Sequence, residues 1–504
     1  MKRHILIQFS VVFLTLSSLL AVPPPMKMTT PIPEGIATPD KLETRIGTLT
    51  SFDGVPDKET TELVYDQLAF QRATQAFLST IQVSSMAAME NGIRKFGPPN
   101  RTALLFEELM DSKALWLTPN TVSIYQVMWL ELGDEPMVLE TPPKVLGIID
   151  DAWFRYVADF GNAGPDKGKG GKFLLIPPGY QGDIPEEGYY VFHTKTFGNW
   201  FVWRGFQVDG STKPAIDETK KHLKIYPLSQ KDTPPEITFI DMSGKENSTI
   251  HRMDYGYWEE VNQTIQDEPI DPEGLSPEIR GLLASIGIEK GKEFKPDERM
   301  KKILTEAAKV GAITARALAA RPQDERFYIY PGERIWTNPF IDGRYDFLLD
   351  GATLLDSRAY MHFYATGITP AMAIKNVGVG SQYLIGYLDK DKNALDGSKT
   401  YKIHLPPNVP AKDFWSFTVY DCQTRSELQT DQRFPGIDNN SKELKANEDG
   451  SYDIYFAPEA PEGKEGNWIQ TVPDKAWNTI FRLYGPLQPF YNKTWKPSDP
   501  EMVE

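Results

Sequence analysis

A stretch late in the chain, Tyr345–Met372, places charged side chains and a histidine along an apolar helical face. Wound as a helix, the stretch puts five apolar residues on one side: Leu348, Ala352, Leu355, Ala359 and Phe363. Asp356 and Arg358 fall at the edges of this face, and His362 falls within it. Such a face belongs either to a well-packed core helix or to the wall of a site, and periodicity does not separate the two.

Aromatic and cationic residues gather in two strand-like parts of the chain. His193, Trp203 and Arg204 lie on adjacent runs of the first part, and the second part adds four candidates: Trp415, Trp468, Arg482 and Tyr484. Aromatic platforms with polar partners suit sugars or other partly apolar ligands. These seven side chains, together with Asp356, Arg358 and His362, are therefore the ten candidate ligand-binding residues. Most aromatics of a β-domain are nevertheless core residues.

The arginines within these apolar runs impose a further expectation. Arg204, Arg358 and Arg482 each need a carboxylate or carbonyl partner if they are buried. The first candidates for such partners are three aspartates: Asp150, Asp356 and Asp421.

Motifs of known catalytic chemistry are missing from the sequence. It contains no Gly-x-Ser-x-Gly elbow, no His-Glu-x-x-His and no Cys-His pairing, and its single cysteine, Cys422, is typical of a buried apolar residue. The acidic segment at 389–397 lacks the glycine and glutamate of an EF-hand and is better explained as a hairpin loop. We therefore expect no metal and no cofactor, and no catalytic residue can be named.

Composition and charge restrict the class of protein. The chain has 504 residues, of which 40% are hydrophobic and 12% aromatic, and a formal net charge of −15. Its length favours more than one domain, and its charge argues against nucleic acid as a partner. Lys2, Arg3 and His4 precede the apolar run Ile5–Leu20, a pattern typical of a signal peptide. We therefore expect an exported protein, periplasmic or secreted, with no membrane span after signal removal.

Periodicity predicts an α+β fold: two antiparallel β-rich, sandwich-like domains joined by a helical connector. Helical patterns cover about 57–94, Tyr257–Gln266, Ser276–Ile286 and Asp297–Ala320, whereas 114–240 and 383–504 read as strands with no intervening helix evident. The predicted organisation is a signal peptide (1–21), a flexible lead (22–40), an N-terminal β-rich domain with its opening helix (41–240), the connector (241–375) and a C-terminal β-sandwich (376–504).

Several long motifs resemble two paired domain-of-unknown-function families. LTPNTVSIYQVMWLEL and DFGNAG resemble family 1254 in the N-terminal part, and ATGITPAMA, GSQYLIGYLDKDKNALDGSKTYKIHLP and FWSFTVYDCQTRSELQT resemble family 1214 in the C-terminal part. The resemblance implies exported proteins with two β-rich domains and no agreed activity. The N-terminal motif of that family usually carries two aspartates near the places that Val122 and Glu131 occupy here, so a polar site at those positions is altered.

Two hypotheses for function remain. The first is an exported protein that binds a small-molecule or carbohydrate-like ligand, or a partner, through aromatic-lined β-domain surfaces; a homo-oligomer is left open. The alternative is a hydrolase, possibly metal-dependent, whose acid/base pair is assembled at the domain interface from Asp356, His362 and residues of the N-terminal sheet. The stretch 345–372 itself is best interpreted as a domain-joining core helix. His362 follows Arg358 by four residues and should therefore be neutral at pH 7.

Overall fold

The computed structural model describes residues 29–503 of the chain. The chain divides into two compact units, Met1–Gln67 and Leu68–Glu504. The described part of the first unit holds a small antiparallel sheet, followed by the start of a long helix. Its strands are β1 (Lys41–Thr44), β2 (Gly47–Phe52) and β3 (Val55–Pro56), in the order β1-β2-β3. The predicted signal peptide and residues 22–28 of the predicted lead lie outside the described residues.

The long helix α1 (Lys58–Arg94) begins where the sequence predicts a cap. The Asp57 carboxylate accepts a hydrogen bond from the backbone N–H of Thr60 at 2.7 Å, which satisfies one of the free amides of the first turn. Within the second unit, the apolar positions Ala73, Phe77 and Ile81 of this helix are fully buried. The predicted opening helix is therefore confirmed with nearly the predicted bounds.

The N-terminal β-region consists of two sheets that share one core. The six-stranded sheet has the order β14-β4-β6-β12-β8-β9, and the four-stranded sheet has the order β11-β10-β7-β13. Their strands are β4 (Thr102–Leu105), β6 (Ile124–Glu131), β7 (Met137–Glu140), β8 (Leu146–Asp151), β9 (Tyr156–Gly161), β10 (Lys172–Ile176), β11 (Tyr190–His193), β12 (Gly198–Gly205), β13 (Lys224–Pro227) and β14 (Thr238–Asp241). Leu139 and Phe173 of one sheet and Phe201 and Trp203 of the other belong to one hydrophobic cluster. Two facing sheets with a common core form a sandwich.

This region also holds a helix that the strand pattern does not predict. Helix α2 (Lys213–His222) buries only Ile216 and Thr219, so its sequence carries little apolar periodicity. Its clearest sign is Pro214, which stands in the first helical turn where proline is favoured. The expectation of strands without a helix between them is therefore wrong at this place.

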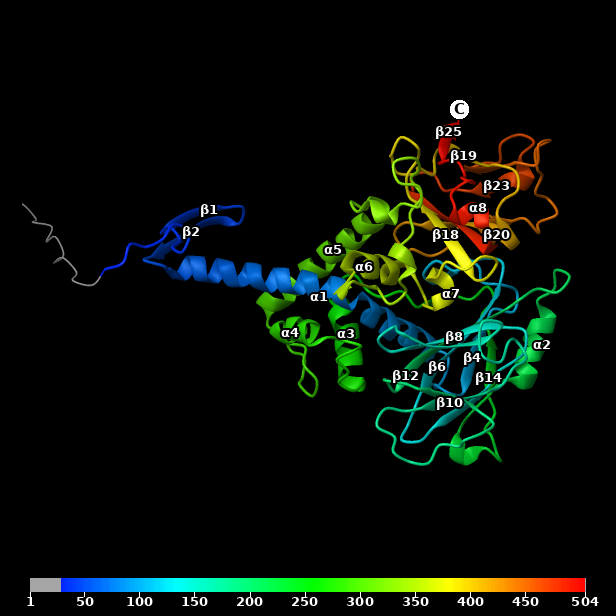
Figure 1. The fold of residues 1–504 in the computed structure, drawn as a ribbon, viewed down its shortest axis with the longest axis horizontal. Coiled ribbons are helices and arrows are strands. Elements are labelled where there is room, and N and C mark those ends of the chain that lie inside the picture. Colours follow the sequence, from blue (N-terminus) through cyan, green and yellow to red (C-terminus); the bar gives the residue numbers. More distant parts are fainter. Residues whose placement is uncertain (1–28, 504) are drawn as a thin grey trace, which may run out of the picture. The chain divides into compact units, whose positions relative to one another are not determined.

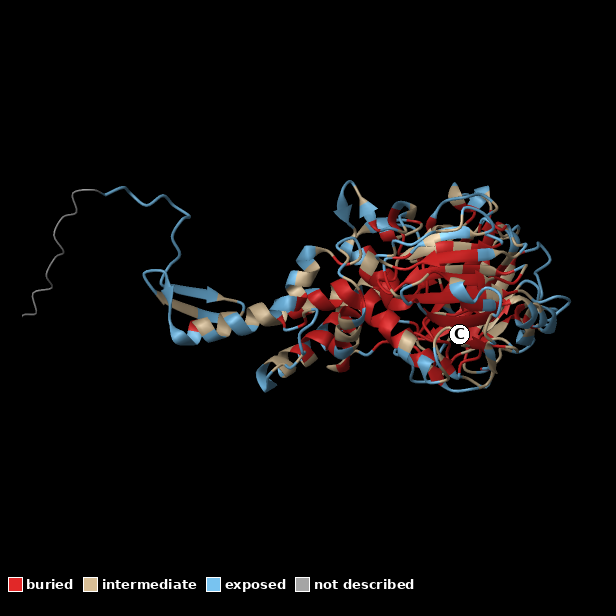
Figure 2. Ribbon diagram, turned by 90° about the horizontal axis from the view of Figure 1, so that it is seen from below, coloured by how far each residue is buried: buried red, intermediate tan, exposed pale blue. Residues whose placement is uncertain are grey.

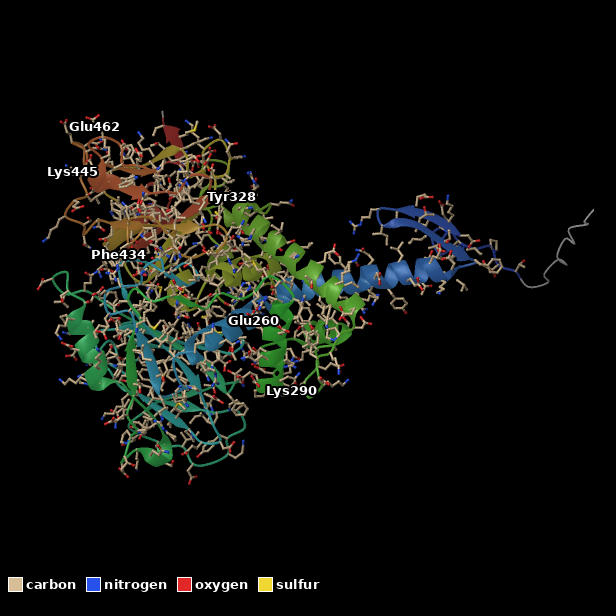
Figure 3. All side chains as sticks on the ribbon, turned by 180° about the vertical axis from the view of Figure 1, so that it is seen from behind. Glu260, Lys290, Tyr328, Phe434, Lys445 and Glu462 are labelled. Atoms are coloured by element: carbon tan, nitrogen blue, oxygen red, sulfur yellow. The ribbon has the colours of Figure 1, made fainter. Side chains whose placement is uncertain are left out.

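A helical layer packs against the described part of α1 that follows Gln67 (Figure 1). Its helices are α3 (Gly256–Asp267), α4 (Pro277–Ser285) and α5 (Glu298–Ala320). Ser276 caps α4 and Asp297 caps α5, with side-chain oxygens that accept hydrogen bonds from the backbone amides of Ile279 and Met300. Glu260 of α3, labelled in Figure 3, accepts a hydrogen bond from Ser84 of α1 at 2.6 Å, which ties the two helices together.

The stretch 345–372 is not one helix. It forms a two-stranded hairpin of β16 (Leu348–Leu349) and β17 (Ala352–Thr353), then α6 (Leu355–Tyr364) and the short α7 (Pro370–Ala373). Asp350 and Gly351 both have positive φ, which makes the turn that separates the hairpin strands. Ala359 and Phe363 are buried as predicted, but Leu348 and Leu355 are 45% and 49% exposed. Only the second half of the predicted apolar stripe is therefore a core face.

The C-terminal β-region is a second sandwich. One sheet has the order β18-β24-β20-β21 and the other the order β23-β22-β19-β25, and both contribute to a single hydrophobic cluster. The strands are β18 (Ser381–Gly386), β19 (Thr400–Leu405), β20 (Ala411–Asp421), β21 (Gly436–Asp438), β22 (Tyr452–Ala457), β23 (Trp468–Gln470), β24 (Trp477–Pro486) and β25 (Glu501–Val503), with α8 (Gln488–Tyr491) before the last. The α+β class is confirmed.

Buried residues extend through the sheets and the helices beside them (Figure 2). The six-stranded sheet is covered on its second face as well, because Val127, Trp129 and Trp200 share a cluster with Met89 of α1 and Met361 of α6. Strands β5 (Ala114–Leu115) and β15 (Asn247–Ser248) pair in parallel at the edge of this layer. Both β-regions and the helices therefore pack as one body from Leu68 onward.

A buried ion pair fixes the corner after β8, and its loss gives the first prediction. Asp151 is 2% exposed, and Arg155 donates to it at 2.7 Å and to Asp271 at 2.5 Å. In Arg155→Met the buried carboxylate loses its cation, so we expect the free energy of unfolding to fall by about 3 kcal/mol. Urea unfolding at pH 7 measures this loss.

The matched control is Arg326→Met, which breaks a pair between Arg326 and Asp324 at the surface. Exposed pairs contribute little, so this variant should unfold close to wild type. An equal loss of stability in both variants would contradict the special role of the pair at Asp151.

Candidate functional site

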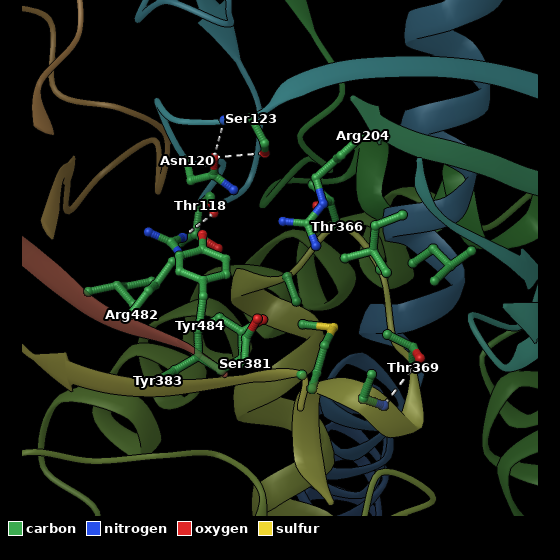
Figure 4. Close-up of a pocket in the computed structure, with 18 of the residues that line it drawn as sticks. Thr118, Asn120, Ser123, Arg204, Thr366, Thr369, Ser381, Tyr383, Arg482 and Tyr484 are labelled. Atoms are coloured by element: carbon green, nitrogen blue, oxygen red, sulfur yellow. Dashed lines mark hydrogen bonds between the residues drawn. The ribbon is translucent and has the colours of Figure 1, made fainter. Parts of the chain in front are cut away.

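A cavity of about 540 Å³ lies where the N-terminal sheet, helix α6 and the C-terminal sheet meet. Its volume falls within the range of roughly 300–1,000 Å³ that is usual for pockets of small organic ligands. Figure 4 shows its polar side chains: Thr118, Asn120, Ser123, Arg204, Thr366, Thr369, Ser381, Tyr383, Arg482 and Tyr484. Both β-regions therefore contribute walls to one cavity.

The strand registers explain why polar groups gather at one place. In the C-terminal sheet, Arg482 of β24 stands opposite Tyr383 of β18, and Tyr484 stands opposite Ser381. In the N-terminal sheet, Arg204 of β12 stands opposite Tyr125 of β6. Directly opposed residues on one face lie about 5 Å apart, so each arginine has a tyrosine as its nearest cross-strand neighbour.

Arg482 is a buried cation that bonds only to neutral oxygens. It is 4% exposed and donates to the backbone carbonyl of Thr118 at 2.8 Å and to the hydroxyl of Thr418 at 3.2 Å. Its guanidinium also lies 5.7 Å from the centre of the Tyr420 ring. These contacts fix the position of Arg482 without neutralising its charge.

Arg204 is held more loosely. Within residues 29–503 its guanidinium makes no hydrogen bond or ion pair, and it lies 6.0 Å from the centre of the Tyr125 ring. Figure 4 shows it directed into the cavity, between Ser123 and Thr366. Its donors are therefore free to meet a ligand.

Carboxylates near the two arginines do not balance them. Asp413 is the one acidic residue among the described lining residues, and it is exposed at the rim. Glu427 is close enough to feel the charge of Arg482, but burial first, and then Asp111, raise its pKa well above the usual range. Both carboxyl oxygens of Glu427 lack a hydrogen-bond partner among the described residues, so no described carboxylate pairs directly with Arg204 or Arg482.

Tyr484 presents a third donor. Its ring stacks on Phe414 with 4.0 Å between centroids, and its hydroxyl has no hydrogen-bond partner among the described residues. Burial raises the pKa of Tyr484 to about 12, although Arg482 and Arg204 oppose this. The hydroxyl is therefore a neutral, unused donor beside two arginines.

Asn120 and Ser123 stiffen the wall above these groups. The Asn120 side-chain oxygen accepts from the Ser123 amide at 3.0 Å and from the Ser123 hydroxyl at 2.9 Å, and its side-chain amide donates to the Tyr125 hydroxyl at 3.1 Å. Because these polar groups form hydrogen bonds with one another, this wall shapes the cavity but offers few free donors to a ligand.

The segment between α6 and α7 closes another side of the cavity. The backbone N–H of Ile368 donates to Asp150 at 2.9 Å, and the Thr369 hydroxyl donates to Asp159 at 2.8 Å. Burial raises the pKa of Asp150 well above its usual value and that of Asp159 to about 6. Two carboxyl groups of the N-terminal sheet therefore hold this wall in place.

Three of the sequence-predicted residues line the cavity: Arg204, Arg482 and Tyr484. Trp203 and Trp415 lie instead in the two sandwich cores. Trp468 is half-buried and donates from its indole N–H to the Ala457 carbonyl, and His193 is exposed on β11. These four side chains are not brought to the cavity.

The charged residues of α6 also lie outside it. Asp356 is exposed, and Arg358 is half-buried with a backbone carbonyl that His362 Nδ1 meets at 2.8 Å. His362 is 3% exposed between Phe154 and Phe347, and burial lowers its pKa to about 3. His362 is thus neutral at pH 7 as predicted, although burial lowers its pKa more than the charge of Arg358 does.

The aspartates expected to pair with the arginines have other partners. Asp421 pairs with Lys475, Asp150 accepts from Ile368, and Asp356 is exposed. Carbonyl and hydroxyl oxygens take their place at Arg482. This expectation was therefore wrong in the choice of carboxylates.

Sequence reasoning missed Asn120, Ser123, Tyr383 and Thr369 as lining residues. All four nevertheless belong to motifs that carry the family resemblance: LTPNTVSIYQ, GSQYLIGYL and ATGITPAM. The motif DFGNAG adds Asn162 and Ala163 to the wall. The signal in the sequence was the set of motifs that resemble the two families, whose residues meet at the cavity.

No group of three or more histidine, cysteine, aspartate or glutamate side chains within 29–503 is arranged to hold a metal ion. In the same range, none of the helices combines the length and apolarity that a membrane crossing requires.

The contact of Asp159 with the cavity wall predicts a pH dependence. Because its pKa is higher in the folded state than in the unfolded chain, this carboxyl should favour folding more strongly as the pH falls through about 6. Between pH 7 and pH 5 we expect it to add about 1 kcal/mol to the stability of the wild type relative to Asp159→Asn. Urea unfolding of both proteins at the two pH values measures this, and a parallel change in both would contradict it.

Comparison with known proteins gives the family context. Residues 100–227 match a family described as Protein of unknown function (DUF1254), and residues 380–488 match one described as Protein of unknown function (DUF1214). No curated protein matches the chain.

Two solved structures match the chain, and the first of them is similar in fold. The crystal structure of the VPA0106 protein from Vibrio parahaemolyticus has a TM-score of 0.52 and 20% identity, over 86% of this chain and 100% of that one. An uncharacterised protein from Burkholderia cenocepacia has a TM-score of 0.40 and 14% identity, over 88% of this chain and 97% of that one. The chain thus matches two families of unknown function, DUF1254 and then DUF1214, in the order that its motifs predict.

Proposed function

We propose that this protein binds an anionic small molecule in the cavity between its two β-regions. The observation that carries the proposal is the pair of arginines, Arg204 and Arg482, which line one cavity without a carboxylate partner among the described residues. Removing a cation from water is costly unless an opposite charge meets it. An anionic ligand would supply that charge.

The charge of the whole molecule makes the cavity distinctive. The chain carries a formal net charge of −15, whereas the described lining residues include two arginines and a single exposed carboxylate. A concave site with apolar walls concentrates the field of its own charges. The charges that line the cavity therefore favour an anion there, although the protein as a whole is acidic.

The motifs that resemble the two families also contribute to this site. Four motifs from both regions contribute lining residues, including Asn120, Asn162, Thr369 and Tyr383. The arginines themselves come from NWFVWRG and TIFRLYG. A common ligand site would explain why separate parts of the chain supply one cavity.

The hydrolase alternative gains no support from the residues first considered for it. His362 is enclosed by Phe154 and Phe347, and Asp356 is exposed, so the two do not share a cleft. A carbohydrate-like ligand is also less favoured than an anion, because sugars do not need two cations.

We propose further that the protein acts after export, since Lys2, Arg3 and His4 precede the apolar run Ile5–Leu20. The test is expression of the full chain in a bacterial host, with fractionation and intact mass measurement. A shortened chain in the periplasmic or secreted fraction, cut near Ala21, is the expected result. A full-length chain retained in the cytoplasm would contradict export.

Anion binding is tested by substitution of the freer arginine. In Arg204→Gln a cation without hydrogen bonds is lost, so the fold should persist while anion binding weakens by at least about tenfold. Isothermal titration with decanoate, benzoate and inorganic phosphate measures the affinity of wild type and variant.

The matched control is Arg321→Gln, which removes an equal charge from an exposed position at the end of α5. It should bind these anions as the wild type does. If none of the three probes binds the wild type, or if both variants lose affinity equally, the proposal is wrong.

A further inference from the structure

The cavity has a polar part and an apolar part, and their separation points to the class of ligand. This inference rests on the proposed anion binding and refines it. The polar part is defined by Arg204, Arg482 and the Tyr484 hydroxyl. Tyr484 is 9% exposed, and its hydroxyl lacks a partner within the described residues, which is costly for a buried donor. A ligand oxygen would satisfy it.

These three donors lie close enough to influence one another. Both arginines act on the pKa of Tyr484, and Arg482 acts on that of Arg204. Figure 4 shows Tyr484 beside Arg482, with Arg204 across the cavity from them. Donors that surround a small space suit one compact anionic group, such as a carboxylate or a phosphate, whose oxygens accept several hydrogen bonds.

The apolar part is built from the shared core of the N-terminal sheet and α6. Ile148, Val202, Phe340, Met361 and Met372 line the cavity and belong to one hydrophobic cluster or pack against it. Thr369 lies on this side, but its hydroxyl is already bonded to Asp159. This wall thus offers contact to apolar groups and few free donors.

We infer that the ligand is an amphipathic organic anion, with one compact anionic head and an apolar body. The head lies between Arg204, Arg482 and Tyr484, and the body lies along the wall that includes Ile148, Met361 and Met372. A highly hydroxylated ligand would leave its polar groups unpaired against that wall. A small inorganic anion would leave the apolar wall unused.

The experiment is a titration series on the full mature protein by isothermal titration calorimetry. The probes are butyrate, octanoate, decanoate, decanol and decyl phosphate, each below its aggregation concentration. Each methylene that enters the cavity should strengthen binding by about fourfold until the cavity is filled. Decanol, which lacks the charge, should bind at least about tenfold more weakly than decanoate.

One variant locates the head, and a pair of variants locates the body. Tyr484→Phe removes only the unpartnered hydroxyl and should weaken decanoate binding by about tenfold without loss of the fold. Met372→Gln should flatten the dependence on chain length, whereas Met372→Leu should preserve it. Thermal melting confirms that each variant is folded before its affinity is compared.

The outcomes separate this inference from the proposed function. Tight binding of decanoate or of decyl phosphate supports the inference, and the tighter of the two identifies the preferred head. If anions bind but butyrate and decanoate differ by less than about twofold, or if decanol matches decanoate, the amphipathic class is wrong and anion binding stands. If no anion binds at all, the proposed function itself fails.

Discussion

The hydrogen bond from Arg482 to the Thr118 carbonyl, 2.8 Å long, joins the C-terminal sheet to the N-terminal region at the wall of the cavity. Thr118 has a positive φ, a conformation that a threonine seldom adopts without support. Its hydroxyl donates to the Tyr364 carbonyl at 2.6 Å, and its amide donates to the Arg425 carbonyl at 3.0 Å. One residue of the N-terminal region is therefore fixed by α6 and by the C-terminal sheet together, at the wall of the cavity.

A second buried arginine repeats this pattern near the cavity. Arg425 is fully buried, lies 4.0 Å from the centre of the Phe363 ring and donates to the Phe363 carbonyl at 2.7 Å. Burial lowers the pKa of Arg425 to about 9, and two of its nitrogens lack partners among the described residues. The regions are thus joined by cations that bond to backbone oxygens. Such bonds orient a guanidinium but leave its charge uncompensated, which suits a site for anions.

The alternation of side chains along each β-strand determines how much of the site can be predicted from the sequence. Trp203 and Arg204 are neighbours in β12, so their side chains point to opposite faces: the tryptophan enters the sandwich core and the arginine reaches the cavity. The same rule separates Trp415, a core residue, from Phe414, which lines the cavity. Arg482 and Tyr484 are two apart and share a face. This alternation allows only one residue of each adjacent pair to reach the cavity. It does not show which face of the strand meets the other β-region.

The wall formed by the segment 365–372 depends on contacts that no local pattern encodes. A Cβ at Gly367 would lie 2.6 Å from the end of the Ile148 side chain, so a larger residue there would require that side chain to shift. Its neighbours Ile368 and Thr369 bond to Asp150 and Asp159, more than 200 residues earlier in the chain. Helical periodicity correctly buries Ala359 and Phe363 of α6 but is uninformative after Tyr364, where the helix ends and the chain packs against a sheet. Local sequence patterns therefore predict individual helices and strands. The cavity instead forms where two sheets and one segment, all far apart in sequence, come close together.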